Sequence, residues 1–113
     1  MLIRNLTDVT AETPAMEGVK GVSLRWLVSK EQGAKNYAMR LFEIEPGGLI
    51  PMHDHKDSEH EIFVLEGEAL LKTPEKNYQL KPGMALFVEP GDSHSFVNTS
   101  DRAFKFLCVI PLK

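Results

Sequence analysis

The four histidines of this chain lie in two short segments, and three of them fall within eight positions. His53, His55 and His60 belong to GGLIPMHDHKDSEHEIFVLEG, whereas His94 stands alone in PGDSHSFVN. Imidazole is the commonest protein ligand for transition metals. A single histidine on a half-buried strand is more often a hydrogen-bonded structural residue. The constellation as a whole predicts one metal site assembled from two stretches of the chain.

The spacing of these histidines suits extended chain. Residues two apart on a strand point to the same face, roughly 6.6 Å apart, so His53 and His55 can face one ion from one side. The segment 56–58 (KDS) is turn-forming. We therefore expect the chain to reverse there, with His60 opening the returning strand. Turns around the next apolar strand would bring His94 to the same place.

Short strand candidates separated by turn residues must position the histidines. No segment has both the period and the length of a confident helix. Many short strands with turns between them predict an all-β sandwich or barrel. We expect a single domain of residues 1–113, with 1–20 as an N-terminal edge segment and 21–113 as the barrel. The predicted strands are 2–6, 22–28, 37–44, 61–65, 68–72, 77–80, 85–88, 94–98 and 103–110.

The first histidine segment resembles the first motif of the cupins, a family of small β-barrels. This motif is usually written G-x5-H-x-H-x(3,4)-E-x6-G. Gly47, His53, His55 and Gly67 match it, and His60 stands where the family usually has glutamate. Glu59 would serve as the ligand at the shorter spacing, but Gly67 would then be one residue out of register. We predict His60 as the ligand, with Glu59 pointing outward or supporting a ligand.

The second histidine segment resembles the second cupin motif, G-x5-P-x-G-x2-H-x3-N. Gly83, Gly91, His94 and Asn98 fall at its intervals, and the proline is shifted by one position to Pro90. The two motifs together span residues 47–98. The resemblance implies an all-β double-stranded β-helix, the cupin jelly-roll barrel.

The predicted ligand set is His53, His55, His60 and His94, as in the compact four-histidine, manganese-type cupins of thermophilic bacteria that the chain resembles. That resemblance implies manganese, with iron as another family metal. By affinity alone, nitrogen ligands favour copper, nickel or zinc. Four neutral imidazoles leave a divalent ion its full charge, so it should be a strong Lewis acid and reluctant to reach higher oxidation states. An octahedral ion would keep two positions open.

Strand parity predicts a substrate pocket beside this ion. Phe96 shares a strand face with His94, and the last strand presents Phe106 and Cys108 on one face. Cys108 could also be a further metal ligand, but a small core residue is the preferred interpretation. Arg40 lies mid-strand among apolar neighbours and needs a carboxylate or a bound anion if buried. A structural ion pair or a solvent-facing head is the alternative for Arg40. The predicted pocket consists of Arg40, Ile50, Phe96, Phe106 and Cys108.

Composition limits the partners and the location. The chain has 113 residues, is 42% hydrophobic and carries a formal net charge of −3, so we expect no affinity for nucleic acid. One cysteine allows no intrachain disulfide. No run approaches the ~20 apolar residues of a membrane span, and the N-terminus lacks a signal-peptide core. We therefore expect a cytoplasmic protein without membrane contact.

Several strands are apolar on both faces, as in EIFVLEG and FKFLCVIPL. An antiparallel strand with one solvent-exposed face should alternate between apolar and polar residues. The outer face must therefore be covered, either by the chain's own N-terminal segment or by a second subunit. We expect a homodimer.

No phosphate-binding, dinucleotide-binding or nucleophile-elbow motif is present, so any chemistry belongs to the metal. The resemblance implies a metalloenzyme of the dioxygenase type, and the aromatic pocket lining together with the lack of a phosphate-binding motif favours a small apolar or aromatic substrate. One alternative is a non-redox isomerase or cyclase in which the ion polarises a carbonyl. The other is a non-catalytic cupin that binds or senses a small ligand. The sequence does not identify the substrate, and it does not decide between an enzyme and a binding protein.

Overall fold

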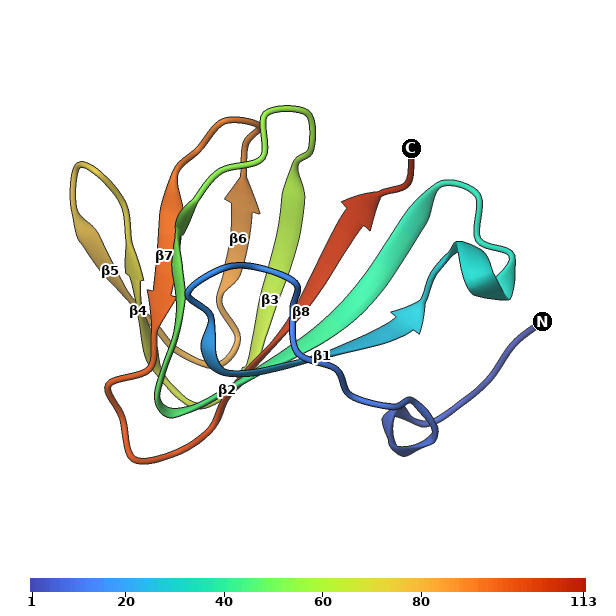
Figure 1. Ribbon diagram of the computed structural model, residues 1–113, viewed down its shortest axis with the longest axis horizontal. Coiled ribbons are helices and arrows are strands. Elements are labelled where there is room, and N and C mark those ends of the chain that lie inside the picture. The colour runs from blue at the N-terminus through green and yellow to red at the C-terminus, as the bar shows by residue number, and fades with distance from the viewer.

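Strands dominate the computed structural model, which describes residues 1–113 (Figure 1). The only helical segments are two short 3-10 turns, η1 (Leu6–Asp8) and η2 (Lys30–Gln32). All strand pairs are antiparallel, and the predicted all-β fold is confirmed. The strands are β1 (Lys20–Val28), β2 (Tyr37–His53), β3 (His60–Glu66), β4 (Ala69–Lys72), β5 (Asn77–Leu80), β6 (Ala85–Val88), β7 (His94–Val97) and β8 (Phe104–Pro111).

The strands form one curled sheet in the order β5-β4-β7-β2-β8-β3-β6, and β1 pairs with β2 outside this order (Figure 1). The long strand β2 joins the parts of the sheet. Its residues 37–44 pair with β8, and its later residues Leu49 to His53 pair with β7. The end strands β5 and β6 do not pair with each other. The curl is therefore open along one side.

Strand β2 is longer than the predicted strand 37–44, because the chain bends at its glycines without leaving the sheet. Gly47 has a φ of 81°, which few residues other than glycine adopt. A Cβ on Gly48 would lie 2.7 Å from the carbonyl oxygen of Lys20. Glycine thus lets β2 pass closely under β1 and exchange β8 for β7 as its partner.

The predicted strand 2–6 is wrong. Residues 6–8 form the 3-10 turn η1, and the Asn5 side chain accepts a hydrogen bond from the backbone N–H of Thr7. The backbone N–H of Asn5 donates in return to the carboxylate of Asp8. Such local side-chain bonds compete with sheet pairing.

The apolar core lies on the inner face of the curl, where aromatic rings from β2, β7 and β8 stack in a row. The rings of Phe42 and Phe106 are 5.0 Å apart between centroids and nearly parallel. Phe96 stacks on the other side of Phe106 at 4.9 Å. Phe104 and Val64 beside them are fully buried. This row supports one wall of the cavity described below.

The N-terminal segment covers the inner opening of the curl and leaves the outer sheet face exposed. Met16 and Val19 pack against the core, and Glu12 pairs with Leu24 of β1 in an isolated bridge. On the outer face, the side chains of Phe63 and Phe87 are 45% and 61% exposed. The alternative in which the N-terminus covers both faces is therefore wrong.

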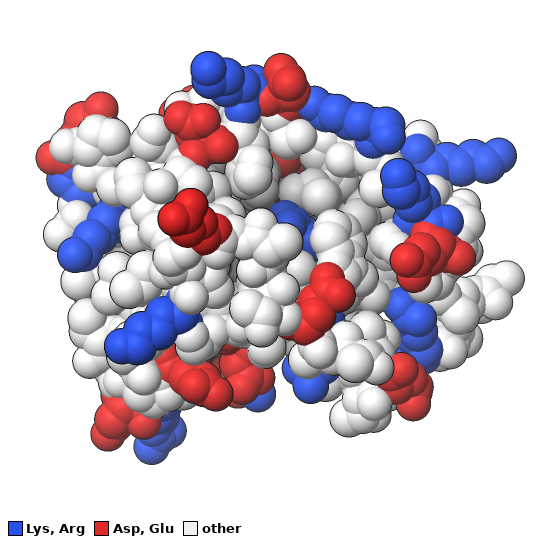
Figure 2. Space-filling model, in the orientation of Figure 1, with Lys and Arg blue, Asp and Glu red and all other residues white.

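No helix of the structure is long and apolar enough to cross a membrane. On the face drawn in Figure 2, acidic and basic side chains are interspersed around broad uncharged areas.

Candidate metal centre

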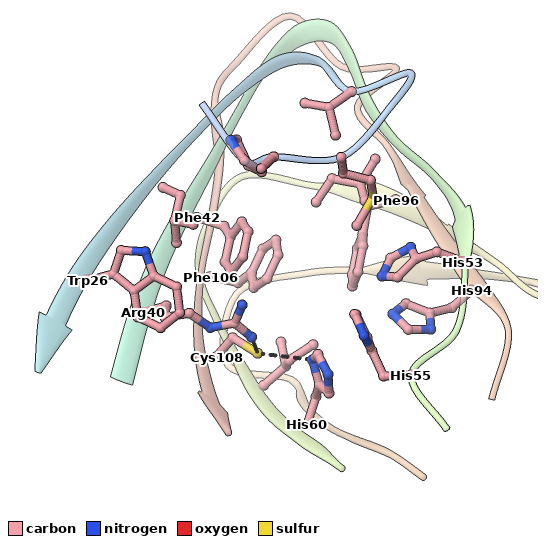
Figure 3. Close-up of a pocket in the computed structure, with 17 residues that line it drawn as sticks. Trp26, Arg40, Phe42, His53, His55, His60, His94, Phe96, Phe106 and Cys108 are labelled. Atoms are coloured by element: carbon pink, nitrogen blue, oxygen red, sulfur yellow. Dashed lines mark hydrogen bonds between the residues drawn. The ribbon is translucent and has the colours of Figure 1, made fainter. Parts of the chain in front are cut away.

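The structure brings all four histidines to one end of the curled sheet (Figure 3). His53 ends β2 and pairs directly with His94, the first residue of β7. His60 opens β3, and His55 lies in the connection between β2 and β3. The distances between ring centroids are 4.4 Å for His53–His94, 5.1 Å for His53–His55, 4.8 Å for His55–His60 and 6.3 Å for His60–His94.

Two of the rings are held by backbone carbonyls. Nδ1 of His53 lies 2.8 Å from the Pro51 oxygen, and Nδ1 of His94 lies 2.9 Å from the Asp92 oxygen. A carbonyl oxygen only accepts, so each Nδ1 carries the proton and each Nε2 keeps its lone pair. Histidines that bind metals are oriented in this way by their other ring nitrogen.

The third ring, that of His60, contacts a thiol. Its Nδ1 lies 3.4 Å from Sγ of Cys108, and the same sulfur accepts a hydrogen bond of 3.0 Å from Nη2 of Arg40. Burial raises the pKa of Cys108, so the sulfur is a neutral thiol at pH 7. His60 can offer Nε2 to a metal when its Nδ1–H donates to this sulfur.

Three of the imidazoles have lowered pKa values, with desolvation as the first cause. Burial and then the nearby charge of Arg40 lower the pKa of His60, which is only 7% exposed, to about 3. Burial also lowers the pKa of His94, against the opposing effect of the bond to Asp92. For His55, burial and then the charge of His53 lower the pKa. Neutral rings at pH 7 are the form that binds metal.

Glu59 lies outside the histidine cluster. Its side chain is exposed, and its hydrogen bond to Glu61 is the main cause that raises the pKa of Glu61. No carboxylate lines the cavity beside the histidines. Apart from the Cys108 thiol behind His60, the donors at this site are imidazoles, which suit a divalent transition metal. As the side chains stand, no three His, Cys, Asp or Glu residues form a group that would hold an ion. The ligand set stays a prediction.

A cavity of about 220 Å³ adjoins the histidines and is lined mostly by apolar side chains (Figure 3). The structure places the predicted pocket residues together on its wall, although their contact with a substrate stays a prediction. These residues are Arg40, Ile50, Phe96, Phe106 and Cys108.

Sequence reasoning missed two parts of the cavity wall. Trp26 of β1 pairs with Arg40 across the β1–β2 ladder, and the alternation of Val22, Leu24 and Trp26 on one strand face was a usable signal. The segment from Pro14 to Val19 also lines the cavity. That segment has no strand or helix period, so nothing in its sequence pointed inward.

Arg40 has no carboxylate partner, and the structural ion pair considered for it is wrong. The ion pairs of the chain join Lys105 to Glu43 and to Glu66. The Arg40 guanidinium instead lies between two aromatic rings, 5.4 Å from the centroid of Trp26 and 4.9 Å from that of Phe42.

Two motif residues outside the histidines are structural. Gly47 donates its N–H to the Asn98 oxygen at 2.8 Å, and Asn98 donates its N–H to the Gly48 oxygen at 3.0 Å. The buried Asn98 side chain donates to the carbonyls of Ile44 and Arg102. These bonds hold the bend of β2 against the end of β7, and thereby place His53 next to His94.

Comparisons with known proteins agree with the two motifs. Residues 40–110 match the Cupin_2 family, described as a cupin domain. The chain is 33% identical to the oxalate-binding protein of Thermotoga maritima over 99% of this chain and 94% of that protein. The structure of the polyketide cyclase RemF from Streptomyces resistomycificus superposes with a TM-score of 0.95 and 36% identity, covering 100% of this chain and 80% of that one. A predicted oxalate decarboxylase from Thermotoga maritima gives a TM-score of 0.85 and 31% identity over 100% of both chains. The chain therefore belongs to the cupin family.

Proposed function

We propose that this cupin is a metalloenzyme that binds one divalent ion through His53, His55, His60 and His94 and carries out non-redox chemistry on a small aromatic substrate. The observation that supports this most is the convergence of four imidazoles at one wall of an apolar cavity. Two of these rings have Nδ1 fixed by a carbonyl and Nε2 free. Manganese is the proposed metal, from the resemblance to four-histidine cupins.

The chemistry follows from the ligands and the wall. A bound divalent ion would act as a Lewis acid that polarises a carbonyl oxygen. The ring of Phe96 meets the ring of His94 edge-on at 5.7 Å between centroids, so a planar substrate can lie against aromatic rings beside the ion. Met16 and Val19 close the cavity from the N-terminal side and limit the access of water.

We propose a cyclase-type or isomerase-type reaction in preference to the dioxygenase reaction that the sequence resemblance implies. Four neutral ligands stabilise the lower oxidation state of the ion, which disfavours oxygen activation. The similarity to a polyketide cyclase extends over the whole chain. We therefore propose ring closure of a poly-carbonyl compound, in which an enol carbon adds to a polarised carbonyl and water leaves.

The test uses the purified protein, after elemental analysis, and a stable aryl triketone. A cyclase converts this compound, without consuming oxygen, into a product lighter by one water, as mass spectrometry will show. The same reaction should disappear in His94→Ala. Oxygen uptake coupled to substrate loss would instead establish a dioxygenase. If the protein as purified contains no metal, and added divalent metal neither binds nor produces turnover, both enzyme proposals are contradicted.

The outer sheet face leads us to propose a homodimer. Exposed apolar side chains on neighbouring strands β3 and β6 include Phe63, Leu65 and Phe87. Exposed apolar surface of this kind marks interaction sites. A second copy of the same face is the partner that we propose. The cytoplasmic location stays a prediction.

A further inference from the structure

Arg40 places a positive charge in the cavity without a negative partner. Its only side-chain hydrogen bond goes to the sulfur of Cys108, and the ion pairs of the chain do not include it. Its Nε is buried and has no hydrogen-bond partner. A buried donor without a partner costs free energy, and more so when the group is charged. The arrangement is therefore incomplete without an acceptor.

Nothing on the cavity wall supplies that acceptor. The wall contains one arginine, four histidines and no aspartate or glutamate. A divalent ion on neutral imidazoles would add two further positive charges. The cavity as a whole thus selects a ligand that brings negative charge.

The guanidinium is already fixed in place. Trp26 and Phe42 both lie within cation–π distance of it, and the sulfur of Cys108 holds Nη2. An arginine held in this way loses little side-chain freedom when it binds, and its planar fork matches a carboxylate. Preorganisation of this kind is typical of a binding residue rather than a solvated surface charge.

A row of rings connects this charge to the histidines. Phe42 contacts Arg40, Phe106 stacks on Phe42, and Phe96 stacks on Phe106 and meets His94. Figure 3 shows Arg40 between Trp26 and the histidine cluster, with Cys108 bridging to His60. A ligand with an aromatic body and one acidic end can cover the rings and reach both the arginine and the histidines.

We infer that Arg40 is the anion-binding residue of the cavity and that the ligand is an aromatic carboxylic acid, with the carboxylate on the guanidinium and the ring along Phe42, Phe106 and Phe96. This inference deepens the proposed function by naming the substrate class, and it relies on that function only for the role of the ion. Arg40 determines specificity and binds substrate directly.

Trp26 is the only tryptophan of the chain, so its fluorescence reports on this cavity. The probes are phenylacetate and its neutral analogue phenylacetamide, added to the purified protein at constant ionic strength. We expect phenylacetate to give a saturable change and to bind at least tenfold more tightly than phenylacetamide. This comparison needs no variant, so it holds even if Arg40 is required for folding.

Variants then assign the difference to one residue. Arg40→Gln should weaken phenylacetate binding at least tenfold and leave phenylacetamide unchanged, whereas Arg40→Lys should fall between the two. Arg102 is exposed and lies outside the cavity, so Arg102→Gln should behave like the wild type. Equal binding of acid and amide, no saturable response to the acid, or undiminished acid binding in Arg40→Gln would each overturn the inference.

The outcome is separable from that of the proposed function. In the metal-poor variant His94→Ala, the difference between acid and amide should persist, because it depends on Arg40. A chain that contains no metal but prefers the acid through Arg40 would contradict the proposed function and support this inference. A metal-loaded chain that cyclises the triketone but binds phenylacetate and phenylacetamide equally well would support the proposed function and contradict this inference.

Discussion

Cys108 contacts two groups to which we assign different roles, His60 as a metal ligand and Arg40 as the anion-binding residue. Its sulfur contacts Nη2 of Arg40 at 3.0 Å and Nδ1 of His60 at 3.4 Å. Because burial raises the pKa of the thiol, the sulfur stays uncharged and does not form an ion pair with the arginine. The residue therefore positions both neighbours without neutralising either.

Replacing Cys108 tests this positioning role. In Cys108→Ala, His60 loses the partner of its Nδ1, and we expect the affinity for metal to fall about 10-fold to 100-fold, as for other groups that orient metal ligands. Cys108→Ser should recover much of the affinity, since its hydroxyl can take the same bonds. Competition with a chelator measures both. Wild-type affinity in the alanine variant would show that the thiol only fills space.

The lowered pKa values predict that the metal-free protein loses stability in acid. His60 binds a proton at pH 6.5 when unfolded but only near pH 3 when folded, so acid favours the unfolded state. Protonation of His60 costs no stability above pH 6.5. Each pH unit from 6.5 down to about 3 lowers the free energy of unfolding by up to about 1.4 kcal/mol. His94 and His55 act in the same direction.

Urea unfolding of the metal-free wild type and of His60→Gln between pH 7 and pH 4 measures this effect. The quantity compared is the slope of the unfolding free energy against pH. Other acidic groups contribute equally to both proteins, so the difference between the two slopes reports on His60. We expect the variant to have the shallower slope. Parallel slopes would mean that His60 is protonated as easily in the folded state as in the unfolded state.

At the scale of elements, turns and bends set the position of the site more than the strands do. The predicted strands 77–80 and 85–88 agree with β5 and β6 residue for residue, because the turn residues that flank these short segments leave few alternatives. Parity also placed Phe96 and Phe106 on the inner face, where they line the cavity. The extension of β2 through Gly47 could not be predicted, since glycine is as typical of a turn as of a bend within a strand.

Gly67 gives a sharp test of these bends. A Cβ at this position would lie 2.2 Å from the Ala103 oxygen, and its φ is 78°. We expect Gly67→Ala to destabilise the fold by more than about 4 kcal/mol, the range of exceptional substitutions. Gly83 has a similar φ of 90° but no atom within 4 Å of its Cβ.

Gly83→Ala is therefore the matched control, with only the backbone cost of roughly 1–2 kcal/mol. Thermal unfolding of both variants separates steric overlap from backbone preference. Equal losses of stability would mean that the contact with Ala103 relaxes easily.

At the scale of the whole molecule, the curl has two apolar faces, and the chain itself covers only the inner one. The inner face is covered by the N-terminal segment, and Arg4 ties that segment to β1 through the carbonyls of Trp26 and Leu27. The sequence could not assign the segment to either face, because its contacts are irregular and depend on distant residues. The outer face around Phe63 and Phe87 has no cover within the chain.

The dimer proposal predicts a mass of about twice 12.7 kDa in sedimentation at micromolar concentration. Phe87→Glu should shift the mass to that of a monomer, because a charge in an apolar interface is costly. Leu2 is also exposed but lies in the N-terminal segment, so Leu2→Glu should leave the dimer intact. A monomer mass for the wild-type protein under these conditions would contradict the dimer proposal.

The metal content of single variants tests the central claim most directly. Elemental analysis of the purified wild type should find one divalent transition metal per chain. Replacing any of His53, His55, His60 or His94 by alanine should lower that content sharply, whereas Glu59→Ala should leave it unchanged. Full metal content in His60→Ala together with loss in Glu59→Ala, or a wild type that binds no metal, would contradict the four-histidine centre.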